Sequence, residues 1–436
     1  MSPSNCSQWG STARCFEYSD ENAVCSRRSS SARRFRLARK DLLAQHAQVS
    51  DSSLIHTLAE LIRINSVNSA YEGGPGEGEI AAWVRRFFEQ RHIEVWEHEV
   101  FPGRPNVIAR LPGRDSSRRI ILEAHMDTVS VKGMTIPPFE PRIEDGKIFG
   151  RGSCDTKAGL AAMMHAVASL AADGLQPPCE VWLAAVVDEE FSYRGVVKLC
   201  EEILDGTRPK CATVAALVAE PTGLRAVIAS KGVLRWRILV RGKSAHSSKP
   251  HLGVNAINHM ARVVLMLEED HRHLAMREHP LLGPATCNVG VIHGGVQVNF
   301  VPDQCAIEID RRLLPGEPVE AVLAHYQSLL DALMAANPTL DAFMEAPLLT
   351  DEALGTAADS PPAQLASALL KELRLDSALC GVPFGSDASK LSRAGIPSLI
   401  FGPGSIDQAH AAVEFVEIQQ VQTASEFFRN FLLRFN

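Results

Sequence analysis

Residues 120–129 read Ile120-Ile-Leu-Glu-Ala-His-Met-Asp-Thr-Val129, an apolar run that ends in a histidine and an aspartate two positions apart. In a β-strand, residues i and i+2 point to the same face, so we expect His125 and Asp127 to lie side by side where the strand leaves its sheet. A neutral imidazole is a good metal ligand, and a neighbouring carboxylate can fix its tautomer. The plain alternative is an exposed pair at a strand end, because His-x-Asp is short and common.

The same design recurs further along the chain. Continuous apolar runs are typical of buried strands in parallel sheets. In open α/β sheets, ligand sites form outside the carboxyl ends of such strands. Three further runs end in this way: Val181–Val187 before Asp188-Glu189-Glu190, Val214–Ala219 before Glu220, and Ile396–Phe401 before a Gly-rich turn and His410.

Asp155 joins this set from the segment Gly150-Arg-Gly-Ser-Cys-Asp-Thr-Lys157. A helical pattern follows and closes at Gly174, so the plain alternative is that Asp155 only caps that helix. Acids at single strand ends are common on protein surfaces. Four strand ends that share one residue set, together with Asp155, are hard to explain as solvated surface, and we therefore predict a metal site.

The donor set contains two histidines, one carboxylate that could be shared and several glutamates, and it suits two zinc ions, with cobalt or manganese as alternatives. Two metals about 3.5–4 Å apart can share a carboxylate, lower the pKa of a bridging water and polarise a carbonyl oxygen. A free carboxylate must then take the proton from that water and deliver it to the leaving nitrogen. Glu189 and Glu190 offer one ligand and one base, and their spacing does not decide which is which.

The composition limits the function classes. The net charge of −7 gives no electrostatic footprint for nucleic acid or an anionic membrane. No apolar run reaches the length that spans a bilayer. None of the ten cysteines has Cys-x-x-Cys spacing, and no secretory signal is evident, so we expect reduced thiols in a cytoplasmic setting.

A chain of 436 residues is expected to form two domains. Residues 1–48 are rich in Ser and Arg and are predicted to be a disordered extension. Residues 49–230 and 347–436 are predicted to form an α/β catalytic domain with a mixed, largely parallel sheet flanked by helices. Residues 231–346 follow the order strand–helix–strand–strand–helix–strand, which fits a smaller inserted α+β domain.

At this point the chain resembles a known family, the acetylornithine deacetylase and succinyl-diaminopimelate desuccinylase group of two-zinc aminoacylases and metallopeptidases. The resemblance covers about residues 50 to 436, and its motifs are specific only together. They are His125-Met-Asp-Thr-Val129, Gly150-Arg-Gly-Ser-Cys-Asp-Thr-Lys157, Asp188-Glu-Glu190, Glu220-Pro-Thr222 and His410.

The resemblance implies a role for each matching residue. Residues 231–346 would be a lid that in relatives commonly also forms a dimer interface, so a homodimer is expected. The implied roles are His125, Asp155 and Glu220 around one zinc; Asp155, Glu190 and His410 around the other, with Asp155 bridging; Glu189 as general base; and Asp127 as the group that orients His125.

Three residues of the insert match family positions near the substrate. His246, in Gly242-Lys-Ser-Ala-His246, matches a histidine that donates to the developing oxyanion, often from the partner subunit. Asn299 and Arg312 match contacts to the substrate carboxylate, and a guanidinium can pair bidentately with such a group. The alternatives are a surface loop histidine and an ordinary inter-strand ion pair.

The expected activity is hydrolysis of the amide of an N-acylated amino acid, with acetylornithine as the leading substrate. N-succinyl-diaminopimelate and short peptides, the substrates of a dipeptidase or carboxypeptidase, are alternatives. A catalytically silent metal- or ligand-binding relative is the competing class, although Glu189 and all ligand positions are retained. One departure is visible: relatives often carry Asn or Asp where Val413 precedes Glu414, which puts a local hydrogen bond in doubt.

Overall fold

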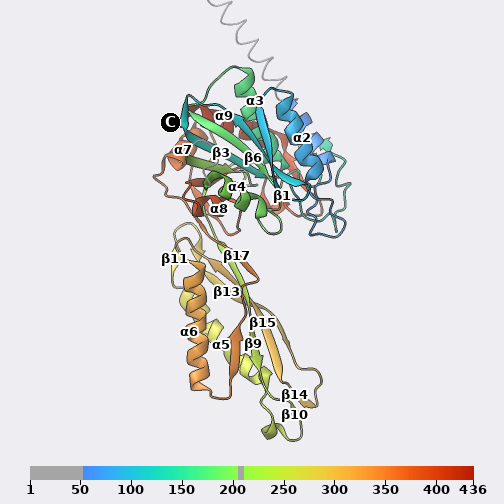
Figure 1. Cartoon of the computed structure of the whole chain (residues 1–436), viewed down its shortest axis with the longest axis vertical. Coiled ribbons are helices and arrows are strands. Elements are labelled where there is room, and N and C mark those ends of the chain that lie inside the picture. The colour runs from blue at the N-terminus through green and yellow to red at the C-terminus, as the bar shows by residue number, and fades with distance from the viewer. Residues whose placement is uncertain (1–52, 205–210) are drawn as a thin grey trace, which may run out of the picture. The chain divides into compact units, whose positions relative to one another are not determined.

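The computed structural model describes residues 53–204 and 211–436, so the predicted extension 1–48 lies outside the described residues. Two large sheets organise the described chain, one of nine strands and one of five (Figure 1). The larger sheet is mixed and partly parallel, with helices on both faces. The predicted α/β fold is therefore confirmed.

The nine-stranded sheet has the order β1-β2-β6-β3-β7-β20-β8-β18, and β19 also pairs with β8. Its central strands β6, β3, β7 and β20 run parallel, whereas β1 and β2 are antiparallel to their neighbours. The strands are β1 (Glu94–Phe101), β2 (Arg104–Leu111), β3 (Asp115–His125), β6 (Cys179–Val186), β7 (Ala212–Val218), β8 (Val227–Ser230), β18 (Leu354–Gly355), β19 (Cys380–Val382) and β20 (Ser398–Ile400).

The apolar run in β3 explains why this sheet is buried on both faces. Ile120 and Leu122 of β3 belong to one core cluster and Ile121 belongs to another. Alternate side chains of a strand point to opposite faces, so a continuous apolar run needs a layer of helices on each side. Helices α3 (Lys157–Ala172) and α9 (Ile418–Arg434) supply one layer, and α4 (Arg194–Leu204) and α8 (Ala388–Arg393) supply the other (Figure 1).

Three further helices complete the first layer. A helix over residues 53–63, α2 (Gly78–Glu89) and α7 (Pro361–Glu372) place apolar side chains in the same core cluster as α3 and α9. The predicted end of α3 is found, with Gly174 in a left-handed conformation (φ 63°) just after it. Thr156, and not Asp155, occupies the position before the first turn of α3, so Asp155 does not cap that helix.

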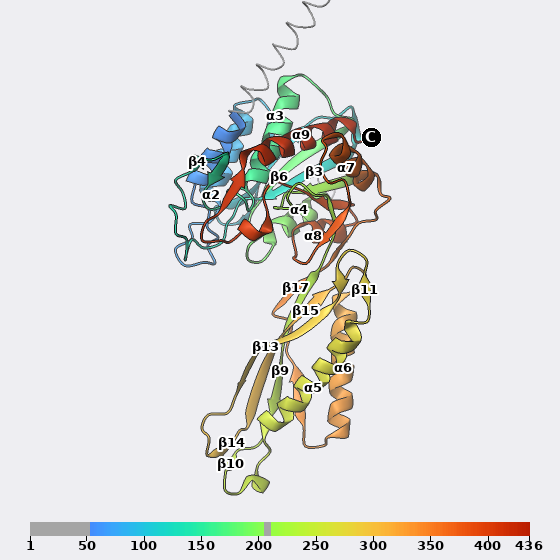
Figure 2. The same cartoon turned by 180° about the vertical axis from the view of Figure 1, so that it is seen from behind.

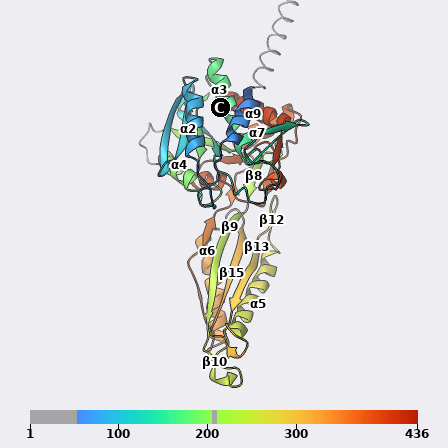
Figure 3. The same cartoon turned by 90° about the vertical axis from the view of Figure 1, so that its right-hand side faces the viewer.

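The five-stranded sheet takes its strands from residues 232–351. Its order is β13-β15-β9-β16, all antiparallel, and β17 pairs with the first part of β9. Helices α5 and α6 pack on one face of it, against the alternate side chains Trp236 and Ile238 of β9 (Figures 2 and 3). Bounds are β9 (Gly232–Arg241), α5 (Ala256–Leu274), β13 (Thr286–Gly294), β15 (Gln304–Leu313), α6 (Val319–Ala336), β16 (Asp341–Met344) and β17 (Leu349–Asp351).

The main helices and strands follow the order expected for the insert. The boundaries at 231 and 346 stay predictions, and β17 continues the pairing with β9 beyond them. Smaller pairings are β21 (Phe415–Glu417) with β5 (Lys147–Phe149) and β4 (Arg142–Glu144), β10 (Ala245–His246) with β14 (Phe300–Val301), and β11 (Glu278–His279) with β12 (Gly283–Pro284).

Among the described residues, no helix combines the length and the apolar character that crossing a bilayer requires. The seven cysteines in this part of the chain are all unpaired, and five of them are buried. Buried free thiols behave as small apolar side chains.

Candidate metal centre

The candidate ligands gather because parallel strands end at one edge of the nine-stranded sheet. His125, the last residue of β3, lies opposite Val186, the last residue of β6. Glu123 of β3 lies opposite Val218, the last residue of β7. The residues that follow β6 and β7 therefore emerge beside His125, and these are Asp188-Glu189-Glu190 and Glu220.

Asp155 lies between two histidines that come from distant parts of the chain. Its Oδ1 is 3.1 Å from His125 Nε2, and its Oδ2 is 3.3 Å from His410 Nε2. His410 Nε2 is also 3.2 Å from Glu190 Oε1. The structure thus brings together two groups of residues, and within each group the ligand atoms all lie within 4.8 Å of one another. The first group is His125, Asp155 and Glu220, and the second is Asp155, Glu190 and His410.

These separations fit two cations. Ligand atoms about 2.1 Å from a tetrahedral zinc ion lie about 3.4 Å from each other. The distances from Asp155 to the two histidines are close to that value, and each histidine faces a different oxygen of the same carboxylate. Asp155 is therefore placed as a bridging ligand would be. Whether the five residues bind metal stays a prediction.

The donors are nitrogen and oxygen atoms, without a thiolate. Cys154, next to Asp155 in sequence, directs its Sγ at the carbonyl oxygen of Ser405, 3.3 Å away. Burial raises the pKa of the Cys154 thiol well above its usual range, so it stays protonated. A set of imidazoles and carboxylates suits zinc, cobalt or manganese.

The charges of the site favour cations. Hydrogen bonds to Asp155 and Glu190 raise the pKa of His410 to about 10. Burial lowers the pKa of His125, but contacts with Asp127 and Asp155 outweigh it and raise that pKa well above the usual value. Burial, followed by repulsion from Asp155, raises the pKa of Glu220. All three shifts show crowded negative charge, which bound metal ions would neutralise.

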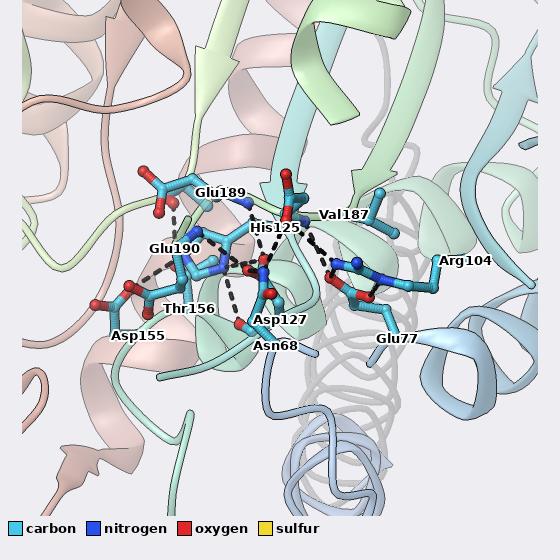
Figure 4. A network of polar contacts seen from close by, with 12 residues as sticks. Asn68, Glu77, Arg104, His125, Asp127, Asp155, Thr156, Val187, Glu189 and Glu190 are labelled. Atoms are coloured by element: carbon cyan, nitrogen blue, oxygen red, sulfur yellow. Dashed lines mark hydrogen bonds and ion pairs between the residues drawn. The ribbon is translucent and has the colours of Figure 1, made fainter. Parts of the chain in front are cut away.

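Asp127 connects the end of β3 to the turn after β6 (Figure 4). Its carboxylate accepts hydrogen bonds from the backbone N–H groups of Glu189 and Glu190, both at 3.1 Å, and from Asn68 Nδ2 at 2.8 Å. His125 Nδ1 contacts both the backbone and the side chain of Asp127. It lies 3.0 Å from the backbone oxygen and 3.5 Å from the carboxylate. Asp127 therefore positions the two glutamates at least as firmly as it positions His125.

A second buried contact supports the same turn. Glu77 is fully buried, pairs with the Arg104 guanidinium through both carboxylate oxygens, and accepts a hydrogen bond from the Asp188 N–H at 3.0 Å. Arg104 also reaches Asp188 Oδ1 at 3.3 Å. Figure 4 shows the guanidinium of Arg104 beside the carboxylate of Glu77. Sequence reasoning missed Glu77, Arg104 and Asn68; the Gly-rich loop 73–78 around Glu77 was the only local signal.

Glu414 holds the loop that carries Asp155. Its Oε1 accepts from the N–H groups of Cys154 and Asp155 at 2.9 and 3.1 Å, and its Oε2 accepts from Gly152 N–H at 3.0 Å and from Arg151 Nη1 at 2.6 Å. Glu414 is fully buried, while Val413 before it is 37% exposed. The apolar Val413 supplies no side-chain hydrogen bond, and the contacts of Glu414 are complete without one.

The three predicted substrate residues lie in the five-stranded unit. His246 is exposed on β10, with Nδ1 2.8 Å from Ser248 Oγ, and Asn299 accepts from Ser247 N–H at 3.0 Å through its backbone oxygen. Arg312, on β15, pairs with Asp310 at 2.8 Å. Within residues 53–204 and 211–436, none of the three bonds to a candidate ligand.

Comparison with known proteins places this geometry in a family. The model of peptidase family M20/M25/M40 matches residues 121–434. The chain belongs to this family. The stretch matched contains all the candidate ligands and Glu189, so the family assignment covers the whole candidate centre.

Individual relatives extend over most of the chain. Acetylornithine deacetylase of Myxococcus xanthus is 33% identical over 324 residues, which cover 72% of this chain and 80% of that protein. A probable succinyl-diaminopimelate desuccinylase of Staphylococcus epidermidis is 26% identical over 400 residues, covering 84% of this chain and 94% of that one.

Solved structures share the fold. The Bacillus subtilis YXEP protein, described as a dinuclear metal-binding peptidase of the M20 family, aligns with a TM-score of 0.68 at 18% identity, covering 88% of this chain and 98% of that one. The expected kinship with the acetylornithine deacetylase and desuccinylase group is confirmed, and the chain is a hydrolase of the M20 family.

Proposed function

We propose that this protein is a two-zinc amidohydrolase that cleaves the amide bond of an N-acylated amino acid. The observation that carries the proposal is the position of Asp155, whose two carboxylate oxygens face His125 and His410 separately. His125, Asp155 and Glu220 would hold one metal ion, and Asp155, Glu190 and His410 the other. Bound there, two such ions supply an activated water and polarise the carbonyl oxygen of the substrate.

Glu189 is the general base of this proposal. It stands outside both ligand groups, while Asp127 fixes its backbone beside them. Burial, together with repulsion from Glu190 and Asp155, raises the pKa of Glu189 well above its usual value. A carboxylate with a raised pKa is a better proton acceptor, so Glu189 takes a proton from water and later gives it to the nitrogen of the leaving amine.

The insert would complete the site from a second copy of the chain. Arg312 pairs with Val233 at the start of β9. Strand β9 ends at Arg241, and β10, which carries His246, follows that end. Eight residues of strand separate these ends by about 26 Å at about 3.3 Å per residue. One small substrate cannot touch both in a single copy. Asn299 lies beside His246, since its backbone oxygen accepts from Ser247 N–H at 3.0 Å. We therefore propose that His246 and Asn299 act in the partner's site, where His246 donates to the oxyanion and Asn299 binds the substrate carboxylate, while Arg312 binds that carboxylate from the copy that holds the metal ions.

A homodimer through the insert follows from this arrangement. Among the described strands, only β15 pairs with β13, which leaves its other side open, and α5 packs beside β13. Apolar side chains are exposed along both elements, including Ile292 (55%) and Leu265 (63%). An open strand edge beside an exposed apolar helix face is suited to pairing with the same elements of a second copy.

N-acetylornithine is the substrate we place first, because the relative that is 33% identical is an acetylornithine deacetylase. N-succinyl-diaminopimelate is the alternative supported by the desuccinylase relative, and short peptides are another. Loss of Glu189 or of a metal ligand would favour the hypothesis of a catalytically silent metal-binding protein. Glu189 and all five candidate ligands are retained.

The test is a substrate panel of N-acyl amino acids and dipeptides, assayed with zinc or cobalt, beside metal analysis. We expect about two metal ions per chain. We expect Glu189→Ala to keep that metal content and to lower kcat by about a thousandfold, because only the proton acceptor is removed. The control is Glu201→Ala, an exposed position on α4 that should behave as wild type. No turnover of any panel member by the metal-loaded protein would contradict the proposal.

A further inference from the structure

Tyr193 occupies the turn between β6 and α4, three residues after Glu190. Its φ is 60°, a left-handed conformation that aromatic residues rarely adopt. The turn is closed by hydrogen bonds from Tyr193 N–H to the oxygen of Asp188 at 2.7 Å and from Gly195 N–H to the oxygen of Val187 at 3.1 Å. Such backbone conformations persist where the surrounding structure imposes them, and they gather at functional sites.

The ring of Tyr193 is clamped by a residue from a distant part of the chain. Lys390 of α8 places its Nζ 3.2 Å from the ring centroid. That ammonium is itself fixed, because it donates to Asp351 Oδ1 at 2.7 Å and to the oxygen of Ser386 at 3.2 Å. The Lys390 side chain is only 13% exposed, so the cation–π contact is partly shielded from water. The direction of the phenol is therefore set by α8.

The hydroxyl group of Tyr193 forms no hydrogen bond with any residue that the structure describes. Burial, together with the nearby carboxylates of Glu189, Asp351, Asp387 and Glu220, raises the pKa of Tyr193 far above its usual range. The hydroxyl therefore remains protonated and available as a donor.

A glycine lies beside this hydroxyl. Gly385 stands next to it, and a Cβ atom at that position would lie 3.9 Å from the Tyr193 oxygen and 2.2 Å from Asp351 Oδ2. A side chain is thus excluded at residue 385. By contrast, the other tyrosine of the site, Tyr71, already donates its hydroxyl to the backbone oxygen of Glu190 at 3.1 Å.

We propose that the Tyr193 hydroxyl donates a hydrogen bond to an oxygen atom of the bound substrate, beside Glu189, and that it helps to determine specificity. The inference rests on the proposed amide hydrolysis, whose substrates carry carbonyl and carboxylate oxygens. The alternative is that Tyr193 only packs between β6 and α8. In that role its ring would matter and its hydroxyl would not.

The substitution Tyr193→Phe separates the two roles, because it removes the hydroxyl and keeps the ring over Lys390. We expect kcat/KM for N-acetylornithine to fall by about tenfold to a hundredfold, with metal content and thermal unfolding unchanged. Tyr326→Phe, in the core of the five-stranded unit, is the matched control and should keep wild-type kcat/KM.

A binding measurement tests the role of the Tyr193 hydroxyl without requiring that the proposed reaction takes place. Tyr193→Phe is combined with Glu189→Ala, and the affinity of the metal-loaded double variant for N-acetylornithine is compared by calorimetry with that of Glu189→Ala alone. Binding weakened by about tenfold supports the donor role even without turnover. Equal affinity overturns it, as does Tyr193→Phe losing metal or folding stability in step with activity.

Discussion

Glu414 acts on the candidate centre mainly through the backbone of the loop that carries Asp155. Its carboxylate accepts three backbone N–H groups of residues 152–155 and one guanidinium N–H of Arg151, all in a fully buried setting. The loop that presents Asp155 lies between β5 and α3 and has no regular structure of its own. These four hydrogen bonds therefore help to hold the loop in position.

Glu414→Gln is expected to lower metal affinity by about tenfold to a hundredfold. The amide replaces one acceptor oxygen with an N–H₂ group, which faces donors and leaves at least one of them without a partner. The measurement is zinc release to a chelator, beside metal analysis after dialysis. Glu417→Gln, an exposed position three residues further on at the end of β21, serves as control. Equal zinc retention by the two variants would argue against a role of Glu414 in holding Asp155.

Residues with ligand chemistry were the predictable part of the site, because histidine and acids at the ends of apolar runs are visible in sequence. Their supporting residues were not. Asn68 reaches Asp127 and Asp188 across 59 and 120 positions, and a buried amide has no sequence pattern that distinguishes it from a surface one. Tyr193 was equally hidden, since its left-handed backbone and the clamp from Lys390 depend on tertiary contacts.

At the scale of elements, the apolar runs predicted the strands β6 and β7 within about two residues at each end. For β3 the run predicted the end at His125, but the strand begins at Asp115, five residues before Ile120. The run Ile396–Phe401 was predicted as a longer strand than β20, which pairs with β7 only over Ser398–Ile400. The order of the strands could not be predicted, because continuous apolar runs look alike whichever neighbour they pair with. Only the fold decides that the acids after β6 and β7 flank His125.

The loop before α2 is tied to the turn after β6 by the Glu77–Arg104 pair. Glu77→Ala leaves the Arg104 guanidinium, with a side chain 14% exposed, without its main partner, and it leaves the Asp188 N–H without an acceptor. We expect a loss of about 3 kcal/mol in the free energy of unfolding, measured by urea denaturation. Glu60→Ala, which breaks the exposed pair with Arg63, should cost less than about 1 kcal/mol. Similar losses for both variants would contradict a supporting role for Glu77.

On the scale of the whole molecule, the sequence predicted the order of elements in the insert but not the distance between its candidate substrate residues. β9 and β15 run side by side over their full lengths, and Arg312 pairs with Val233 at the start of β9. His246 lies in the separate β10–β14 pair, which follows the opposite end of β9 along the chain. Strand length follows from residue count, whereas the strand pairing that separates these residues required the structure. The proposed sharing of the active site between two copies rests on this separation.

Hybrid dimers test that sharing directly. If His246 acts in the partner's site, a dimer of His246→Ala with Glu189→Ala contains one complete site, formed by Glu189 of the first copy and His246 of the second. Each variant alone should be nearly inactive, and the hybrid, purified through two different affinity tags, should recover about half of the wild-type turnover per dimer. Hybrids of His246→Ala with itself, carrying the same tags, are the control. If the hybrid forms and remains as inactive as its parents, His246 acts within its own chain or not at all, and the shared site is wrong.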